Sequence, residues 1–186
     1  MARRPLLQLS DISLTFGGNP VFEGLDLILQ PGDRVALVGR NGSGKSTLMK
    51  IMAGLVETDK GMRTLSRQTS VGYMEQDPTM DGFVTLGDYA VSALDVGEAY
   101  RVDRAVEGLK FDPFRPVATA SGGERRRAAV AKLMAEAPEL MLFDEPTNHL
   151  DIEAIAWLET ELKSTKAGYV LISHDRAFLN KLTRAT

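Results

Sequence analysis

The sequence has no cysteine and only two histidines among its 186 residues. Without cysteine, the chain cannot form disulfides, use a thiol as a nucleophile, or hold zinc or iron–sulfur clusters through thiolates. Two histidines are too few to build a histidine-rich metal cage. These classes of site are therefore excluded for this chain.

Long apolar runs and a strong charge imbalance are also absent. No run reaches the roughly 18 consecutive apolar residues of a membrane span. Ser10 and Asp11 interrupt the N-terminal stretch before it is long enough for a signal peptide. We therefore expect a cytoplasmic protein without direct membrane insertion. The net charge of −3, from 22 basic and 25 acidic residues, argues against a protein that coats nucleic acid but leaves room for a local basic patch.

What is present suits a globular protein, with 44% hydrophobic and 25% charged residues. The length fits one domain, or one domain with a small inserted lobe. Apolar or alternating runs alternate with stretches of helical periodicity, which predicts an α/β fold with a mainly parallel sheet. Strands are expected at 6–16, 21–29, 34–38, 71–75, 140–143 and 169–172. Helices are expected at 45–55, at 85–109 with a break at Gly97, at 122–137, at 152–162 and from 176 onward.

Two of these helices are expected to bury an apolar stripe. The spacing of the apolar residues fits one face of a helix in each case. The stripes are Leu48, Ile51, Met52 and Leu55 in the first, and Ile152, Ile155, Leu158 and Leu162 in the second.

A glycine-rich loop joins the strand at 34–38 to the helix that starts at Lys45, and its sequence fits the pattern G-x-x-x-x-G-K-[ST]. Glycine is needed there because backbone N–H groups must turn inward around a phosphate. We expect Lys45 to bridge the β- and γ-phosphates of a nucleotide and Ser46 to ligate Mg²⁺. A plain flexible turn would not need the Lys-Ser pair in this register. The nucleotide-binding loop is expected to comprise Gly39, Arg40, Asn41, Gly42, Ser43, Gly44, Lys45, Ser46 and Thr47.

Two acids, Asp144 and Glu145, follow the apolar strand at 140–143. The carboxyl ends of strands are where ligands bind in open α/β sheets. We expect Asp144 to hold Mg²⁺ through water and Glu145 to orient or deprotonate the water that attacks the γ-phosphate. The alternative is a pair of charges at a helix N-terminus, which the presence of Lys45 disfavours.

Gln76 and His174 follow two other expected strands at the same edge of the sheet. We expect His174 to contact the γ-phosphate, in preference to the alternative of a polar surface residue. Gln76 would mean nothing alone, but at a strand end it can reach the metal ion or the attacking water.

The segment Ser121, Gly122, Gly123 and Glu124 opens the helix expected at 122–137. Ser-x-x-Glu is a capping box in its own right. Two glycines in a first helical turn, however, cost about 1 kcal/mol each relative to alanine. They make sense if a phosphate held by another molecule approaches the helix N-terminus closely. For arginines 125–127 we favour a solvated face over contact with an acidic partner.

Together these motifs resemble an ATP-binding cassette (ABC) ATPase over nearly the whole chain. In this resemblance the glycine loop is the Walker A motif, Gln76 the Q-loop, Ser121–Glu124 the signature motif, Asp144 and Glu145 Walker B with its catalytic glutamate, and His174 the switch histidine. Phe16 stands where the family has an aromatic residue that stacks on adenine. The resemblance implies a P-loop NTPase fold. It consists of a RecA-like core with an antiparallel N-terminal β part (1–76 and 138–186) and an inserted helical subdomain (77–137) that carries the signature.

Two strings, at 144–151 and 173–180, resemble the ABC-F branch, whose members lack transmembrane domains and carry two cassettes on one chain. Many of them act on ribosomes. The interval between Gln76 and Ser121 is short for the helical arm of those members, which favours the Uup-like subgroup, linked to DNA and ribosome biology. Ala120 stands where leucine is usual, which affects packing more than phosphate contact. Because the chain ends soon after His174, we expect the first cassette of a longer protein.

The resemblance implies ATP and Mg²⁺ as ligands, with each ATP held between the Walker A loop of one cassette and the signature motif of a second. An isolated cassette is then a weak ATPase, and its partner is a second cassette, in the same protein or in a homodimer. Three functions compete: an ABC-F ATPase that acts on a ribosome or on DNA, the energy subunit of a membrane transporter, and a nucleotide-sensing scaffold with little turnover. The Asn-His-Leu-Asp string favours the first.

Overall fold

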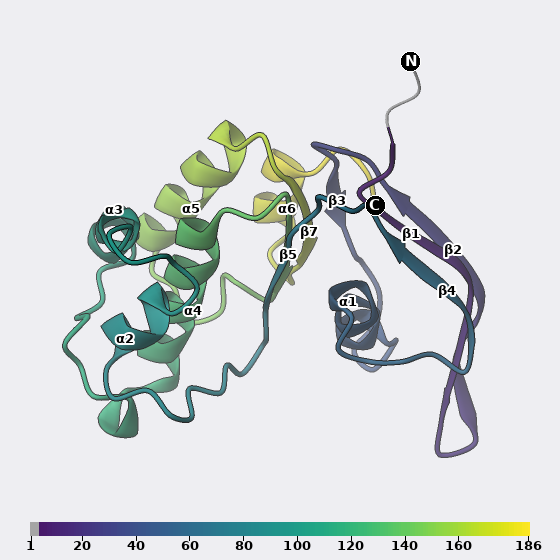
Figure 1. Ribbon diagram of the computed structural model, residues 1–186, viewed down its shortest axis with the longest axis horizontal. Coiled ribbons are helices and arrows are strands. Elements are labelled where there is room, and N and C mark those ends of the chain that lie inside the picture. Colours follow the sequence, from purple (N-terminus) through teal and green to yellow (C-terminus); the bar gives the residue numbers. More distant parts are fainter. Residues whose placement is uncertain (1–3) are drawn as a thin grey trace.

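The computed structural model describes residues 4–186, so the first three residues of the N-terminal stretch lie outside it. Two sheets and a set of helices make up the fold (Figure 1). The strands are β1 (Leu7–Phe16), β2 (Asn19–Leu29), β3 (Arg34–Ala36), β4 (Lys60–Leu65), β5 (Val71–Met74), β6 (Leu140–Asp144) and β7 (Gly168–Ile172). The helices are α1 (Lys45–Ala53), α2 (Leu86–Val91), α3 (Tyr100–Leu109), the short 3₁₀ helix η1 (Val117–Thr119), α4 (Gly122–Glu136), α5 (Ile152–Ser164) and α6 (Arg176–Leu182).

The N-terminal sheet is antiparallel, in the order β2–β1–β4. Alternate residues of β1 are buried, but the alternation shifts phase between Leu9 and Ile12. At this point Asp11 has a φ of 52° and the register with β2 is interrupted. Such a bulge lets both halves of β1 keep their apolar side chains on the buried face.

Strand β4 was not among the strands expected from the sequence. It lies at the edge of the antiparallel sheet and pairs with β1 alone. None of its side chains is fully buried. An edge strand that buries so little has no strong apolar alternation for sequence analysis to detect.

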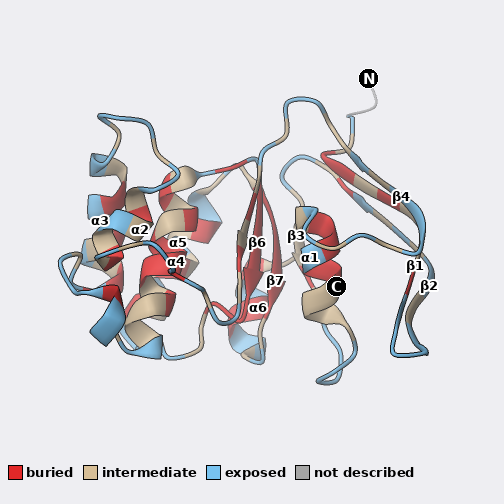
Figure 2. Ribbon diagram, turned by 60° about the horizontal axis from the view of Figure 1, so that its bottom comes forward, coloured by how far each residue is buried: buried red, intermediate tan, exposed pale blue. Residues whose placement is uncertain are grey.

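The second sheet is parallel, in the order β3–β7–β6–β5. Every residue of β6 and β7 is buried, as Figure 2 shows. Parallel strands with both faces covered read as continuous apolar runs, which is why the sequence revealed these two so clearly. The predicted α/β fold with a mainly parallel sheet is confirmed.

Helices cover both faces of the parallel sheet. Helix α1 lies between the two sheets, and α4 and α5 lie on the opposite face, with α2 and α3 packed farther out (Figures 1 and 2). One apolar cluster joins α1 to both sheets, and a second joins the other helices to the parallel sheet. Within residues 4–186, no helix has both the length and the apolar character needed to cross a membrane.

In each of the two predicted apolar stripes, one terminal residue is exposed instead of buried. Helix α1 stops at Ala53 because Gly54 adopts a left-handed conformation, so Leu55 leaves the helix and is 61% exposed. Ile152, the first residue of α5, is 86% exposed, and Ala154 is buried in the first turn instead. The break predicted at Gly97 is confirmed, since this glycine lies between α2 and α3 with a φ of 98°.

Candidate functional site

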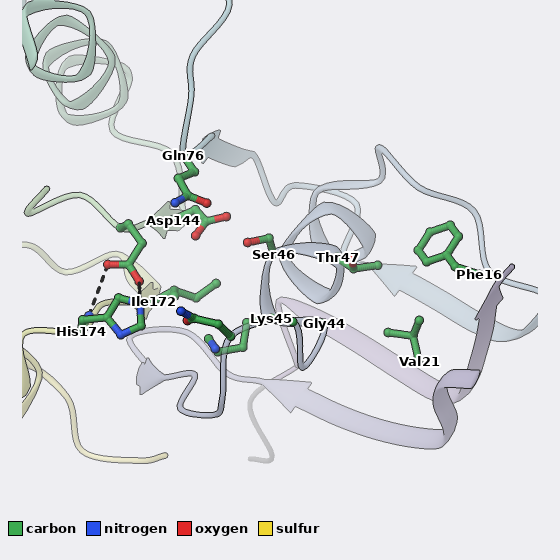
Figure 3. A pocket seen from close by; sticks show the side chains of 13 residues that line it. Phe16, Val21, Gly44, Lys45, Ser46, Thr47, Gln76, Asp144, Ile172 and His174 are labelled. Carbon is green, nitrogen blue, oxygen red and sulfur yellow. Dashed lines mark hydrogen bonds and ion pairs between the residues drawn. The ribbon is translucent and has the colours of Figure 1, made fainter. Parts of the chain in front are cut away.

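The strands of the parallel sheet end at one edge, and the segments that follow them surround a cavity of about 410 Å³ (Figure 3). Its walls come from the glycine loop after β3, from Gln76 after β5, and from the ends of β6 and β7. Residues far apart in the chain therefore meet in one place. The lining residues are Phe16, Val21, Asn41, Gly42, Gly44, Lys45, Ser46, Thr47, Gln76, Asp144, Glu145, Ile172 and His174.

The glycine loop owes its shape to backbone conformations that other residues avoid. Gly42 and Gly44 have φ values of 78° and 87°. A Cβ on Gly44 would also come within 2.6 Å of Val21 Cγ1, so this position is closed to side chains by space as well as by conformation. The loop leads directly into α1, whose first residue is Lys45, so the N-terminal N–H groups of the helix face the cavity.

Lys45 closes the loop in this structure. Its Nζ donates to the carbonyl oxygens of Gly39 at 2.7 Å and Arg40 at 2.9 Å, and the Ser43 N–H donates to the Arg40 oxygen. Gly39, Arg40 and Ser43 thus shape the loop without lining the cavity. The ammonium group lies at the cavity wall, where it offers a positive charge to an anionic ligand.

Asp144 gives the clearest indication of a cation site. Its side chain is 1% exposed, and within the described part of the chain neither carboxylate oxygen has a hydrogen-bond partner. A buried, unpaired carboxylate is costly unless a cation or donor joins it. Burial raises the pKa of the nearby Tyr73 phenol, the negative charges of Asp144 and Glu75 raise it further, and the approach of the phenol to the Asp144 carboxylate, which falls short of a well-formed hydrogen bond, adds to the effect.

The residues around Asp144 fit magnesium. Figure 3 shows the Ser46 hydroxyl and the Gln76 amide on the same side of the cavity as Asp144. Mg²⁺ is usually held by one or two carboxylates, water and substrate phosphates. A cluster of three or more histidine or acidic side chains, which a fully protein-ligated metal would need, does not occur in residues 4–186.

Glu145 lies next to Asp144 in a strained conformation, with a φ of 54° and 4% exposure. Its N–H donates to the Ile172 carbonyl at 2.9 Å. The carboxylate accepts from the backbone N–H of His174 at 3.3 Å, and His174 Nε2 lies 3.2 Å from Oε1. The ends of β6 and β7 thus hold this carboxylate at the cavity wall. Strained positions of this kind concentrate at functional sites.

The far end of the cavity is apolar. Figure 3 shows Phe16 and Val21 beyond Thr47, away from Asp144 and His174. Phe16 is 52% exposed, and an exposed ring of this kind can stack on a planar base. Val21 and Ile172 line the cavity but were not expected from the sequence. No local pattern distinguishes them from other strand residues.

The signature segment lies outside this cavity: none of Ser121, Gly122, Gly123 and Glu124 is among the described residues that line it. Ser121 and Glu124 form the capping box of α4, in which each side chain accepts a hydrogen bond from the backbone N–H of the other. A Cβ on Gly122 would meet nothing within 4 Å, and one on Gly123 would approach no atom closer than 3.4 Å. Packing among residues 4–186 therefore does not require either glycine.

The prediction of a solvated face at arginines 125–127 is wrong for Arg126, which is buried, whereas Arg125 and Arg127 are half-buried. Arg126 is 8% exposed and donates to the Gln76 carbonyl and to the Asp77 carboxylate. Arg125 donates to the Val117 carbonyl, and Arg127 to those of Lys110 and His149. Helix periodicity could not reveal this, because the acceptors, backbone oxygens and the Asp77 carboxylate, belong to other segments of the chain.

Relatives of known sequence match most of this chain. The chain is 48% identical over 183 residues to the ATP-binding protein Uup of Caulobacter vibrioides, covering 98% of this chain and 30% of that protein. It is 32% identical over 207 residues to the energy-dependent translational throttle protein EttA of Mycobacterium tuberculosis, covering 89% of this chain and 37% of that protein. The chain therefore spans about a third of the length of these relatives. They confirm the resemblance to Uup-like proteins.

Solved structures agree on the fold. The ATP binding subunit of an ABC transporter superposes with a TM-score of 0.85 at 25% identity, covering 96% of this chain and 83% of that one. A bacterial Atm1-family ABC exporter with ATP bound superposes with a TM-score of 0.81 at 21% identity, covering 96% of this chain and 36% of that one. The family profile described as ABC transporter matches residues 22–148, which include the glycine loop, Gln76, the signature segment and both acids at the end of β6. On these grounds the chain belongs to the ABC transporter family and carries its ATPase fold.

Proposed function

We propose that this cassette binds ATP with Mg²⁺ in the cavity of Figure 3 and hydrolyses it. The observation that carries the proposal is the buried, unpaired Asp144 carboxylate beside the glycine loop. A bound cation offsets the free-energy cost of burying the Asp144 carboxylate, and a nucleotide triphosphate supplies further oxygen ligands to the cation. Within this proposal Ser46, Asp144 and Gln76 hold the ion, which neutralises charge on the phosphates.

Each remaining wall residue has a role that follows from its position. Lys45 and the N–H groups of the loop and of α1 bind the phosphates, and Phe16 stacks on the base. Glu145 accepts a proton from the attacking water or orients it. His174 holds the Glu145 carboxylate by two contacts and reaches toward the γ-phosphate.

The signature segment serves a second cassette in this proposal. Gly122 and Gly123 begin α4 although alanine would fit at both positions. Glycine at these positions lowers helix stability. Its presence therefore supports the interpretation that a phosphate held by another molecule approaches the start of the helix closely. Two cassettes, in one protein or as two copies, would then hold ATP between the cavity of one and Ser121–Glu124 of the other. The helical insertion at 77–137 would carry its signature segment toward that partner.

For the biological role we propose a cytoplasmic ABC-F ATPase whose ATP-driven closure acts on a ribosome or a nucleic acid. Its support is the similarity to Uup and to a protein named a translational throttle. The energy subunit of a transporter is the alternative, supported by the fold shared with a transporter subunit.

Sedimentation with ribosomes tests this role. The longest native chain containing this cassette, with Glu145→Gln, would be sedimented with ribosomes with and without ATP, and Lys45→Ala would be the matched control. ATP-dependent co-sedimentation of the Glu145→Gln protein, lost in the control, is the expected result. Absence of binding in both states would contradict the ribosomal role and shift support first to DNA and then to transporter subunits.

A further inference from the structure

One side chain of the helix that begins with the signature segment is hydrogen-bonded to a residue of the cavity wall. Arg126 lies in the second turn of α4 and is 8% exposed. Its Nε donates to the Gln76 carbonyl oxygen at 2.8 Å, and its Nη2 donates to Asp77 Oδ1 at 2.9 Å. The two donors of one planar guanidinium thus fix the backbone where the chain leaves β5.

Gln76 is itself part of the cavity wall. A change in its backbone position on ligand binding must therefore move Arg126, break its hydrogen bond, or be resisted by it. Arg125 and Arg127 also donate to carbonyl oxygens, but of Val117, Lys110 and His149, which do not line the cavity in the described chain. Arg126 is distinguished from its neighbours by this contact.

Stability alone does not account for an arginine at this place. Its guanidinium is buried, whereas the carboxylate that pairs with it is 91% exposed. Nη1 is buried with no partner among residues 4–186. Apolar side chains often replace such buried ions without loss of stability, because the desolvation penalty disappears with the charge. An unpaired buried donor in this position calls for another explanation.

We propose that Arg126 is a positioning residue that couples ligand occupancy of the cavity, through Gln76, to the segment Ser121–Glu124. This inference rests on the proposed nucleotide site and adds a link to the half-site offered to a second cassette. Coupling between two sites is reciprocal, so an occupied signature segment also favours the arrangement of Gln76 that binds the nucleotide.

Amide hydrogen exchange of the chain, with and without MgATP, tests the link without relying on turnover. In the parent, MgATP should slow exchange in the glycine loop (39–47) and also at the start of α4 (121–124). Arg126→Met keeps the volume but removes both hydrogen bonds. In this variant MgATP should still slow exchange at 39–47. At 121–124, exchange in the presence of MgATP should be about tenfold faster than in the parent, because the slowing is lost there.

Three further variants sharpen the test. Asp77→Ala removes the exposed carboxylate that pairs with Arg126 and leaves the core unchanged. It should reduce the slowing of exchange by MgATP at 121–124, as Arg126→Met does. Arg126→Lys keeps the charge but has one nitrogen where the guanidinium uses two, so it should restore part of the effect at 121–124. Arg104→Met, at an arginine of α3 that pairs with Glu161 and lies outside the cavity wall, should behave like the parent.

The outcomes separate the two proposals. If MgATP has no effect at 39–47 in the parent, the nucleotide site is wrong and this inference falls with it. If the parent shows the effect at 39–47 but none at 121–124, or if folded Arg126→Met keeps both effects, the nucleotide site stands and the coupling role is overturned. If Arg126→Met does not fold, a parent-like Asp77→Ala overturns the coupling, and a weakened effect at 121–124 supports it.

Discussion

At the residue scale, the turn at Glu145 shows how backbone strain places a functional group. A left-handed conformation costs a residue other than glycine about 1–2 kcal/mol, and here φ is 54°. The bonds to Ile172 and His174 hold the turn in place. As a result Asp144 and Glu145, adjacent in sequence, both reach the cavity. A regular strand would direct them to opposite faces.

Replacing Glu145 by glutamine should separate binding from hydrolysis. Glutamine still accepts the His174 N–H, but it cannot take a proton from water. We expect the affinity for MgATP to stay within about twofold of the parent. The rate of hydrolysis should fall by about 10²–10⁴-fold. Fluorescent-nucleotide binding and single-turnover hydrolysis measure the two quantities.

Lys45→Ala is the contrasting variant, because it removes a phosphate-binding charge and should weaken ATP binding itself. Hydrolysis by Glu145→Gln at the parental rate would show that the role given to Glu145 is wrong.

At the scale of the element, the capping box of α4 predicts a pH dependence of stability. Hydrogen bonds from Ser121 lower the pKa of Glu124 below its ordinary value of 4.5. A carboxylate whose pKa is lower in the folded state stabilises that state above its unfolded pKa, and the contribution is lost as pH falls through the folded value. The free energy of unfolding should therefore decline as the pH falls from about 5 through the lowered pKa of Glu124, and Glu124→Gln should make this decline shallower.

Urea titrations at several pH values would measure this slope. Hydrogen bonds from Ser70 also lower the pKa of Glu139. Glu139→Gln should therefore remove a separate part of the pH dependence of stability, and the effects of the two substitutions should add. An unchanged slope in the Glu124→Gln variant would rule out the capping contribution.

Two helical glycines provide a matched pair for packing. A Cβ on Gly108 of α3 would lie 2.3 Å from Trp157 Nε1, whereas a Cβ on Gly122 of α4 meets nothing within 4 Å. Gly108→Ala should lower the free energy of unfolding by about 1–3 kcal/mol. Gly122→Ala should be neutral or should stabilise the chain by up to about 1 kcal/mol. Urea unfolding followed by the fluorescence of the single tryptophan tests both, and equal effects would contradict the packing seen here.

At the scale of the whole molecule, the cavity and the signature segment, which we propose as two half-sites, do not meet. The cavity holds the glycine loop, and the signature segment is not part of its described wall. If hydrolysis needs both, the activity of this chain depends on pairing. We expect the rate per molecule to rise in proportion to protein concentration while dimers are scarce, and phosphate release over a range of concentrations would measure it.

Complementation gives this prediction its control. Lys45→Ala keeps an intact signature segment, and Gly122→Asp keeps an intact loop, so a mixture should recover hydrolysis that neither variant shows alone. Strong hydrolysis at a rate per molecule independent of concentration would argue against the shared site.

The sequence by itself determined the α/β class, the buried strands β6 and β7, and most of the polar residues that the structure brings to the cavity wall. These features follow from local rules: continuous apolar runs mark strands buried on both faces, and glycines followed by Lys45 and Ser46 mark a phosphate loop. Local rules also placed Gln76, Asp144, Glu145 and His174 at strand ends, and strand ends of a parallel sheet share one edge.

Only the tertiary structure decided the features that depend on contacts between distant segments. The edge strand β4 forms because β1 offers it hydrogen bonds, and Ile152 is exposed because the first turn of α5 buries Ala154 instead. Arg126 is buried because Gln76 and Asp77 supply its acceptors from another element. Periodicity describes one helix or strand at a time, whereas burial and pairing depend on which other elements lie against it.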